Sequence, residues 1–166
     1  MPASQQAPDA AATPDTAAQP SGPHPALRRL DRFVGTWRMS GRTLDSATDN
    51  VTARSTHEWL PGGHFLLQRF EADFAGLDIR SFEVIGYDPA TDTFPSTVYS
   101  NMAPTPLAYR WQVHDDELTI TTEELGATFR GRWSADGTSF SGGWRPNPGR
   151  EGPGNIPYDI SGRAAE

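Results

Sequence analysis

The stretch Leu107–Trp144, LAYRWQVHDDELTITTEELGATFRGRWSADGTSFSGGW, decides the fold. Apolar and polar residues alternate through it with a period of two, which is typical of half-buried β-strands. Turn-forming residues interrupt the alternation at Asp115-Asp116, Leu125-Gly126 and Ala135-Asp136. The stretch therefore predicts four consecutive antiparallel strands joined by three hairpins.

The predicted registers place one apolar face on all four strands. The first hairpin pairs Trp111 with Ile120, the second pairs Ile120 with Gly131, and the third pairs Gly131 with Phe140. A large ring then lies opposite a glycine, as happens where a sheet bends.

The same period of two extends in both directions from this stretch. Before it, Pro25–Val34 has apolar residues at helical spacing and predicts one short helix. The fold class that we expect is all-β, an antiparallel barrel of about ten strands with a short N-terminal helix. The predicted strands are Thr36–Leu44, Val51–Leu60, His64–Phe74, Ile79–Tyr87, Phe94–Asn101, Leu107–His114, Glu117–Glu124, Ala127–Ser134, Thr138–Arg145 and Tyr158–Gly162.

The composition divides the chain into two parts. Residues 1–25 hold six prolines and seven alanines and no large apolar residue except Met1, so we expect a disordered tail. Residues 26–166 hold all 17 aromatic residues and form the predicted barrel domain. The 166 residues are enough for one domain.

Several classes of function are excluded or disfavoured by composition. The chain has no cysteine and no lysine, which excludes disulfides, thiolate chemistry and Schiff bases. A net charge of −7 argues against a nucleic-acid partner. No segment is apolar enough for a membrane helix, and no signal peptide is recognisable, so we expect a cytoplasmic protein with no membrane partner.

Three segments, in order, resemble a known family. They are Phe33–Trp37 (FVGTW), Trp59–Leu66 (WLPGGHFL) and Ile85–Pro89 (IGYDP). They are similar to a bacterial lipocalin-like (calycin-type) barrel family of unknown function, distantly similar to nitrobindin-like and fatty-acid-binding proteins. The resemblance implies a ten-strand barrel around a cavity, with the tryptophan of the first segment closing one end.

The resemblance also implies two features that can be compared with these residues. In lipocalins a late arginine stacks on the first-strand tryptophan, a part that either Arg145 or Arg163 could take here. Nitrobindin-like barrels bind haem through a late histidine, but residues 115–166 contain no histidine. We therefore expect no haem and no other cofactor.

Two histidines flank the Pro61–Gly63 turn and are candidate site residues. If Trp59 opposes His64, then His57 and His64 are diagonal neighbours on the inner wall. They could contact a ligand or act as acid and base, and a hydrogen-bonded structural role stays open. A metal site would need a third ligand, and none is found at a suitable position, so no metal is expected.

Aromatic and amide side chains supply the rest of the candidate site. Their face forms either a packed core or an apolar pocket wall with a few polar anchors. The predicted ligand-binding residues are His57, His64, Gln68, Tyr99, Tyr109, Trp111, Phe129 and Trp133. Candidates for catalysis are His57, His64 and Tyr109.

The expected function is binding of a small, largely apolar or amphipathic molecule in the barrel cavity. The alternative is a cofactor-independent enzyme, a cyclase or isomerase of a natural-product-type substrate, because such catalysis by orientation and desolvation leaves no sequence motif. A structural module that uses the proline-rich tail is a third alternative. A second copy of the chain, forming a homodimer, is an open alternative for the partner.

Overall fold

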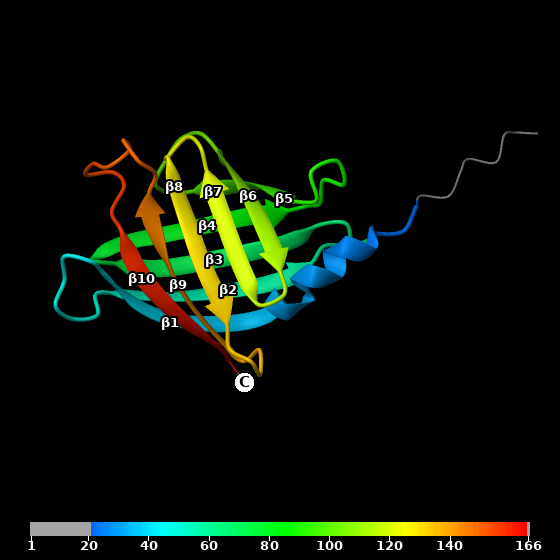
Figure 1. Cartoon of the computed structure of the whole chain (residues 1–166), viewed down its shortest axis with the longest axis horizontal. Helices are drawn as coiled ribbons and strands as arrows, with labels where there is room; N and C mark the ends of the chain where they lie inside the picture. Colours follow the sequence, from blue (N-terminus) through cyan, green and yellow to red (C-terminus); the bar gives the residue numbers. More distant parts are fainter. Residues whose placement is uncertain (1–20, 166) are drawn as a thin grey trace, which may run out of the picture.

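Ten antiparallel strands form a closed barrel, with one short 3₁₀ helix at one end (Figure 1). The structure is a computed structural model and describes residues 21–165; most of the predicted tail lies outside this range. It confirms the all-β class, and every predicted strand is present. The elements are η1 (Pro25–Phe33), β1 (Gly35–Thr43), β2 (Val51–Trp59), β3 (Leu66–Phe74), β4 (Leu77–Ile85), β5 (Phe94–Ser100), β6 (Leu107–His114), β7 (Glu117–Thr122), β8 (Ala127–Trp133), β9 (Ser139–Pro146) and β10 (Tyr158–Ala164).

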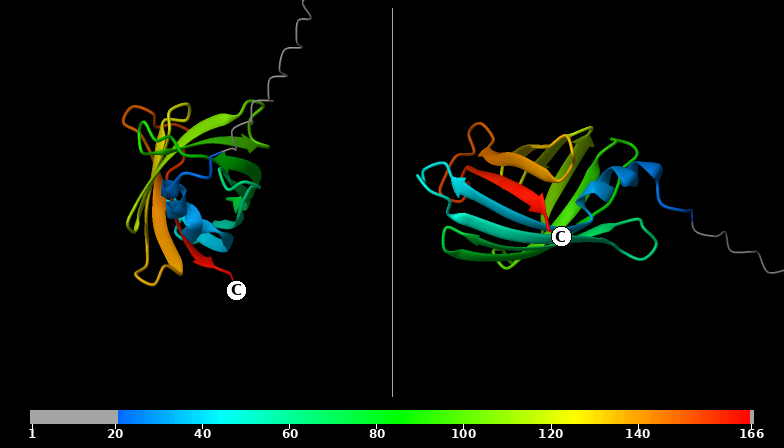
Figure 2. Two further views of the ribbon diagram at one scale, coloured as in Figure 1. Left: turned by 90° about the vertical axis from the view of Figure 1, so that its right-hand side faces the viewer. Right: turned by 90° about the horizontal axis from the view of Figure 1, so that it is seen from below.

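The barrel closes because the first strand pairs with the last. Apart from this pair, every strand pairs with its neighbours in the sequence. In β1, Trp37 faces Ser55 of β2 on one side and Ala164 of β10 on the other. Figure 2 shows β1 and β10 side by side in the view from below. Closure leaves no strand of the described barrel with a free edge.

Alternation along each strand separates an inner from an outer face. In β7, for example, Leu118, Ile120 and Thr122 are buried, while the residues between them keep part of their surface. The inner face carries the apolar core, which gathers residues from β1 to β8 and β10 as well as the helix. The period of two that predicted β6, β7 and β8 therefore also predicted which of their side chains face inward.

One predicted register is confirmed and two are wrong by two residues. Trp111 pairs with Ile120 as predicted. However, Ile120 pairs with Phe129 rather than with Gly131, and Gly131 pairs with Gly142 rather than with Phe140. A shift of two keeps the same residues on the inner face.

The two shifts arise because the connecting loops are longer than two residues. Thr122 and Ala127 form the last pair of β7 and β8, and Gly126 between them has φ of +65°. In the next hairpin Trp133 and Phe140 form the last pair, and Gly137 has φ of +70°. Glycine adopts this left-handed backbone without steric cost, which permits the longer loops.

A ring still covers the strand glycines, but it is that of Phe129, which lies two residues before Gly131 on β8 and diagonal to Gly142 on β9. A Cβ added to Gly131 would lie 2.6 Å from Cε1 of Phe129, and one added to Gly142 would lie 2.6 Å from Cζ of the same ring. The space that the glycines leave is therefore filled by Phe129, as expected for aromatic rings over a bent sheet.

The helix η1 closes one end of the barrel (Figure 1). Its N-terminus is capped by His24, whose Nδ1 accepts a hydrogen bond from the Ala26 amide at 3.1 Å. Leu27, Leu30 and Phe33 are buried along one side of the helix. The helical spacing of these apolar residues thus predicted the face that covers the barrel end.

Phe33 is the residue of the helix that reaches the aromatic core. Its ring lies edge-on to Trp111 and Trp133, with centroid distances of 5.2 and 4.8 Å. Its carbonyl oxygen accepts a hydrogen bond from Nε1 of Trp37 at 2.9 Å. Edge-to-face ring pairs of this kind stabilise a fold beyond the area that they bury.

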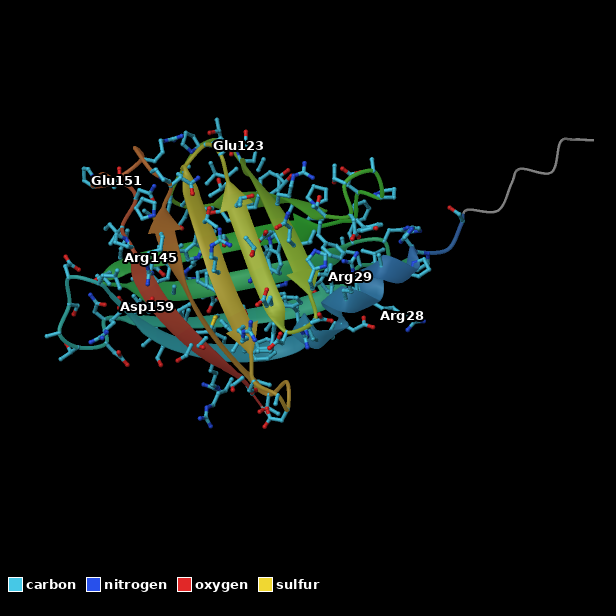
Figure 3. The ribbon with its side chains drawn as sticks, viewed as in Figure 1. Arg28, Arg29, Glu123, Arg145, Glu151 and Asp159 are labelled. Carbon is cyan, nitrogen blue, oxygen red and sulfur yellow. The ribbon has the colours of Figure 1, made fainter. Side chains whose placement is uncertain are left out.

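The arginine that stacks on a barrel tryptophan comes from the helix, not from a late strand. The Arg32 guanidinium lies 4.4 Å from the centroid of Trp133. Arg145 instead pairs with Asp159 at 2.6 Å on the outer face, where Figure 3 shows both side chains. Within residues 21–165, no cation–π contact joins Trp37 to Arg145 or Arg163, so neither of the two candidate arginines takes this part.

Candidate functional site

The structure places most of the predicted site residues on the inner face. Trp111, Phe129, Trp133 and His57 are buried there, with at most 5% of each exposed. Gln68 and Tyr109 belong to the same face and are half-buried. Whether any of these residues contacts a ligand stays a prediction.

His64 is misplaced in the sequence prediction. Trp59 pairs with Leu66 rather than with His64, so β3 begins two residues later than predicted. His64 lies before this strand and is exposed. The residue directly opposite His57 is Gln68. The predicted pair of inward histidines is therefore wrong, because the Pro61–Gly63 turn extends beyond Gly63.

Tyr99 is also wrong as an inner-wall residue. It is 54% exposed and pairs with Phe82 on the outer face. Its neighbour Val98 is the residue of that strand that faces the core. Because Val98 faces inward, Tyr99 must face outward by the alternation of a strand.

Glu83 is an inner-face residue that sequence reasoning missed. Glu83 is only 5% exposed and faces the barrel interior. Ser96 Oγ and Trp111 Nε1 donate hydrogen bonds to the same oxygen, Oε1, at 2.5 and 2.8 Å. The signal was present, since Ile79 and Ile85 share the parity of Glu83 in β4.

Because it is buried, the Glu83 carboxyl gains or loses its proton near neutral pH. Desolvation raises its pKa from 4.5 to about 7, although the hydrogen bonds from Ser96 and Trp111 act in the opposite direction. The pKa of the nearby Tyr109 is raised to about 12, mainly by burial and to a smaller extent by the negative charge of Glu83. Tyr109 therefore keeps its hydroxyl proton and can donate it in a hydrogen bond.

Three further inner-face side chains carry buried polar atoms without a partner in the described part of the chain. These atoms are Nδ1 and Nε2 of His57, Oγ1 of Thr122 and Nε1 of Trp133. Burial lowers the pKa of His57 from 6.5 to about 4, so its ring is neutral at physiological pH. Buried polar groups in native proteins are nearly always hydrogen-bonded, so these atoms are available to a water molecule or to a ligand.

Burial is less complete in one half of the inner face than in the other. On strands β3 to β6, inward side chains near the helix are buried, including Leu66, Ile85 and Phe94 at 0% exposure. Farther along the same strands Ala72 and Val98 are also buried, whereas the other inward side chains are half-buried; they are Gln68, Phe70, Phe74, Ile79, Ser81, Leu107 and Tyr109. The inner face is thus fully buried under η1 and less completely buried toward the opposite end, where Tyr109 packs against Trp144.

The half-buried inward side chains lie next to the polar groups described above. His57, Gln68 and Glu83 occupy directly opposite positions on β2, β3 and β4. Gln68, between the other two, is half-buried. A small molecule that reaches Gln68 is therefore next to a neutral imidazole and a buried carboxyl.

No metal-binding cluster of three or more His, Asp or Glu side chains occurs within residues 21–165. In the same range, the structure contains no helix of the length and apolarity required to cross a membrane. The chemistry that the interior offers is hydrogen bonding, aromatic contact and proton transfer by a carboxyl group.

Comparisons with known proteins agree with the fold. Residues 19–138 match a family described as protein of unknown function (DUF1579). None of the curated proteins matches the chain. The solved structure of Rv2717c from M. tuberculosis has a TM-score of 0.54 over 87% of this chain and 99% of that chain, at 12% identity, which shows a shared fold.

Proposed function

The chain belongs to this DUF1579 family of unknown function, and we propose that its barrel binds a small, largely apolar or amphipathic molecule. The ligand enters from the end opposite η1. The observation that carries the proposal is the set of half-buried inward side chains on β3 to β6, one of which, Gln68, lies directly opposite the buried and unpartnered His57 ring. A site that combines aromatic walls with a few polar groups is typical of small-molecule binding.

The aromatic wall provides the favourable free energy. Burying ~200 Å² of apolar ligand surface would contribute roughly 5 kcal/mol before the loss of translational and rotational freedom is subtracted. This supports micromolar-to-millimolar dissociation constants without polar anchors. Tighter binding requires hydrogen bonds.

The unpartnered polar atoms provide orientation and specificity. A buried donor or acceptor without a partner costs about 1–3 kcal/mol, and a ligand group that satisfies it recovers part of this free energy. The neutral His57 ring offers one donor and one acceptor, and Trp133 Nε1 offers a donor. A ligand with a carbonyl or hydroxyl group at one end of an apolar body fits this set.

The test uses a probe that fluoresces in apolar sites, 1-anilinonaphthalene-8-sulfonate. Ser81→Trp places a ring on the accessible inner face, and Thr52→Trp places the same ring on the exposed outer face of β2. We expect Ser81→Trp to weaken probe binding at least tenfold and Thr52→Trp to leave it unchanged. Wild-type affinity in a folded Ser81→Trp variant would overturn the proposal, and Ser81→Leu repeats the test if the tryptophan prevents folding.

Native mass spectrometry of the purified protein provides a second readout. A co-purifying mass that the Ser81 variants lose, and Thr52→Trp retains, would identify the ligand. An absorbance spectrum above 350 nm distinguishes an apolar metabolite from haem or flavin.

The alternative, a cofactor-independent enzyme in the same interior, is favoured by one observation. A carboxyl whose pKa is about 7 suits proton transfer at neutral pH, and Glu83 has this property beside the accessible row. An isomerase of this type would exchange a substrate proton with solvent. The test is to incubate the co-purified molecule in D₂O with the wild type and, separately, with Glu83→Gln. Deuterium uptake into the molecule with the wild type but not with the variant supports catalysis. No uptake with either protein excludes an isomerase of this type.

A further inference from the structure

A groove on the outer face has a floor of serine side chains. Ser40 of β1 lies directly opposite Ser161 of β10, and Ser161 lies directly opposite Ser141 of β9. All three are exposed. They line two neighbouring depressions of about 620 and 500 Å³. Short side chains in one row, with long side chains in the rows beside it, account for the hollow.

One wall of the groove carries opposed arginines. Arg38 of β1 lies directly opposite Arg163 of β10 in the groove; on its other side, outside the groove, is Arg54 of β2, which in turn lies directly opposite Glu71 of β3. All three arginines are exposed, and within residues 21–165 no carboxylate lies within 4.0 Å of their nitrogens. Arg132, also at the groove, is instead held by Asp116 and Glu117.

The guanidinium groups of Arg38 and Arg163 repel each other, and a bound anion would offset this repulsion. Like charges at directly opposite positions of neighbouring strands destabilise a sheet. The chain has 21 carboxylate side chains and a net charge of −7, yet the larger depression has no acidic residue in its lining.

We propose that this groove binds the phosphate group of a small phosphorylated molecule, held between Arg38 and Arg163. Guanidinium groups match phosphate oxygens with two parallel hydrogen bonds, and the serine hydroxyls of the floor donate further ones. The ligand is a small molecule rather than a nucleic acid, because a chain of net charge −7 repels an extended polyanion. This site is on the outer face and is independent of the barrel interior.

The test is a titration of the ¹⁵N-labelled protein with inorganic phosphate, with sodium chloride at equal ionic strength as the reference. We expect saturable shifts of the arginine Nε–Hε signals of Arg38 and Arg163. Arg38→Gln and Arg163→Gln should each weaken binding at least about tenfold, because a hydrogen bond to a charged group is lost. Arg80→Gln is the matched control, since Arg80 is on β4 and pairs with Asp78 at 3.2 Å.

Several results would overturn the proposal. Shifts that never saturate, shifts equal to those in chloride, or equal weakening by Arg80→Gln would each show only general screening of charge. A second titration compares glycerol 3-phosphate with glycerol. Binding of the ester alone supports a phosphate site, whereas binding of glycerol, or of a DNA oligonucleotide without phosphate binding, contradicts it.

Discussion

Glu83→Gln tests the electrostatics of the barrel interior. Glutamine keeps the shape of the side chain and an oxygen that can accept from Ser96 and Trp111, but it never ionises. The pKa of Glu83 in the fold is about 7, against an ordinary value of 4.5. At about 1.4 kcal/mol for each pH unit, ionising this buried carboxyl costs the fold about 3 kcal/mol.

The direction in which pH changes the free energy of unfolding depends on whether the folded or the unfolded state holds the proton. Between pH 4.5 and 7 the folded state holds the Glu83 proton and the unfolded state has lost it, so the free energy of unfolding falls as pH rises. His57 acts in the opposite direction. Its pKa is lowered from 6.5 to about 4, so the free energy of unfolding rises between pH 4 and 6.5. In the wild type the two contributions nearly cancel between pH 4.5 and 6.5.

Urea denaturation at a series of pH values from 4 to 8 measures the effect. We expect the free energy of unfolding of Glu83→Gln to equal that of the wild type near pH 4 and to exceed it by about 3 kcal/mol at pH 8. Glu71→Gln, which changes an exposed carboxylate on β3, is the control and should show no such divergence. A difference between Glu83→Gln and wild type that does not change with pH would refute the reasoning.

Two further substitutions test the barrel itself. Phe33→Ala removes the ring that closes the barrel end and should lower the free energy of unfolding by about 3–5 kcal/mol. The control is Val34→Ala, at the exposed neighbouring residue, which should change this free energy by less than about 0.5 kcal/mol. Equal effects in urea denaturation would contradict the role of Phe33. Gly41→Ala places a Cβ 2.0 Å from the Asp159 carbonyl oxygen and should cost about 2 kcal/mol or more. Gly152→Ala, where the added Cβ meets no atom within 4 Å, should unfold at the wild-type temperature, and a wild-type melting temperature for Gly41→Ala would contradict the close approach.

The strands were predictable because they follow a period of two. Leu107–His114 matches the predicted bounds, and the inward parity of Trp111 and Phe129 follows from the same alternation. The register between neighbouring strands was harder to predict, because it depends on the length of the loop that joins them. Gly126 and Gly137 permit loops longer than the two residues that we expected.

The candidate site was only partly predictable for the same reason. His57 is on the inner face, but His64 is not, because the position of His64 depended on the length of the Pro61–Gly63 turn. Glu83 was missed although its parity was visible, because a carboxylate on a strand is usually exposed. Its burial depends on Ser96 and Trp111, which come from other strands and have no local signature.

The pairing of β1 with β10 has a consequence for synthesis on the ribosome. Until Tyr158–Ala164 has emerged, β1 lacks the partner that closes the barrel, and β9 lacks its second neighbour. Both strands then present unpaired N–H and C=O groups that another nascent chain can pair with. Because this contact joins the two ends of the domain, its formation is slow, and chaperone binding before release would protect the open sheet.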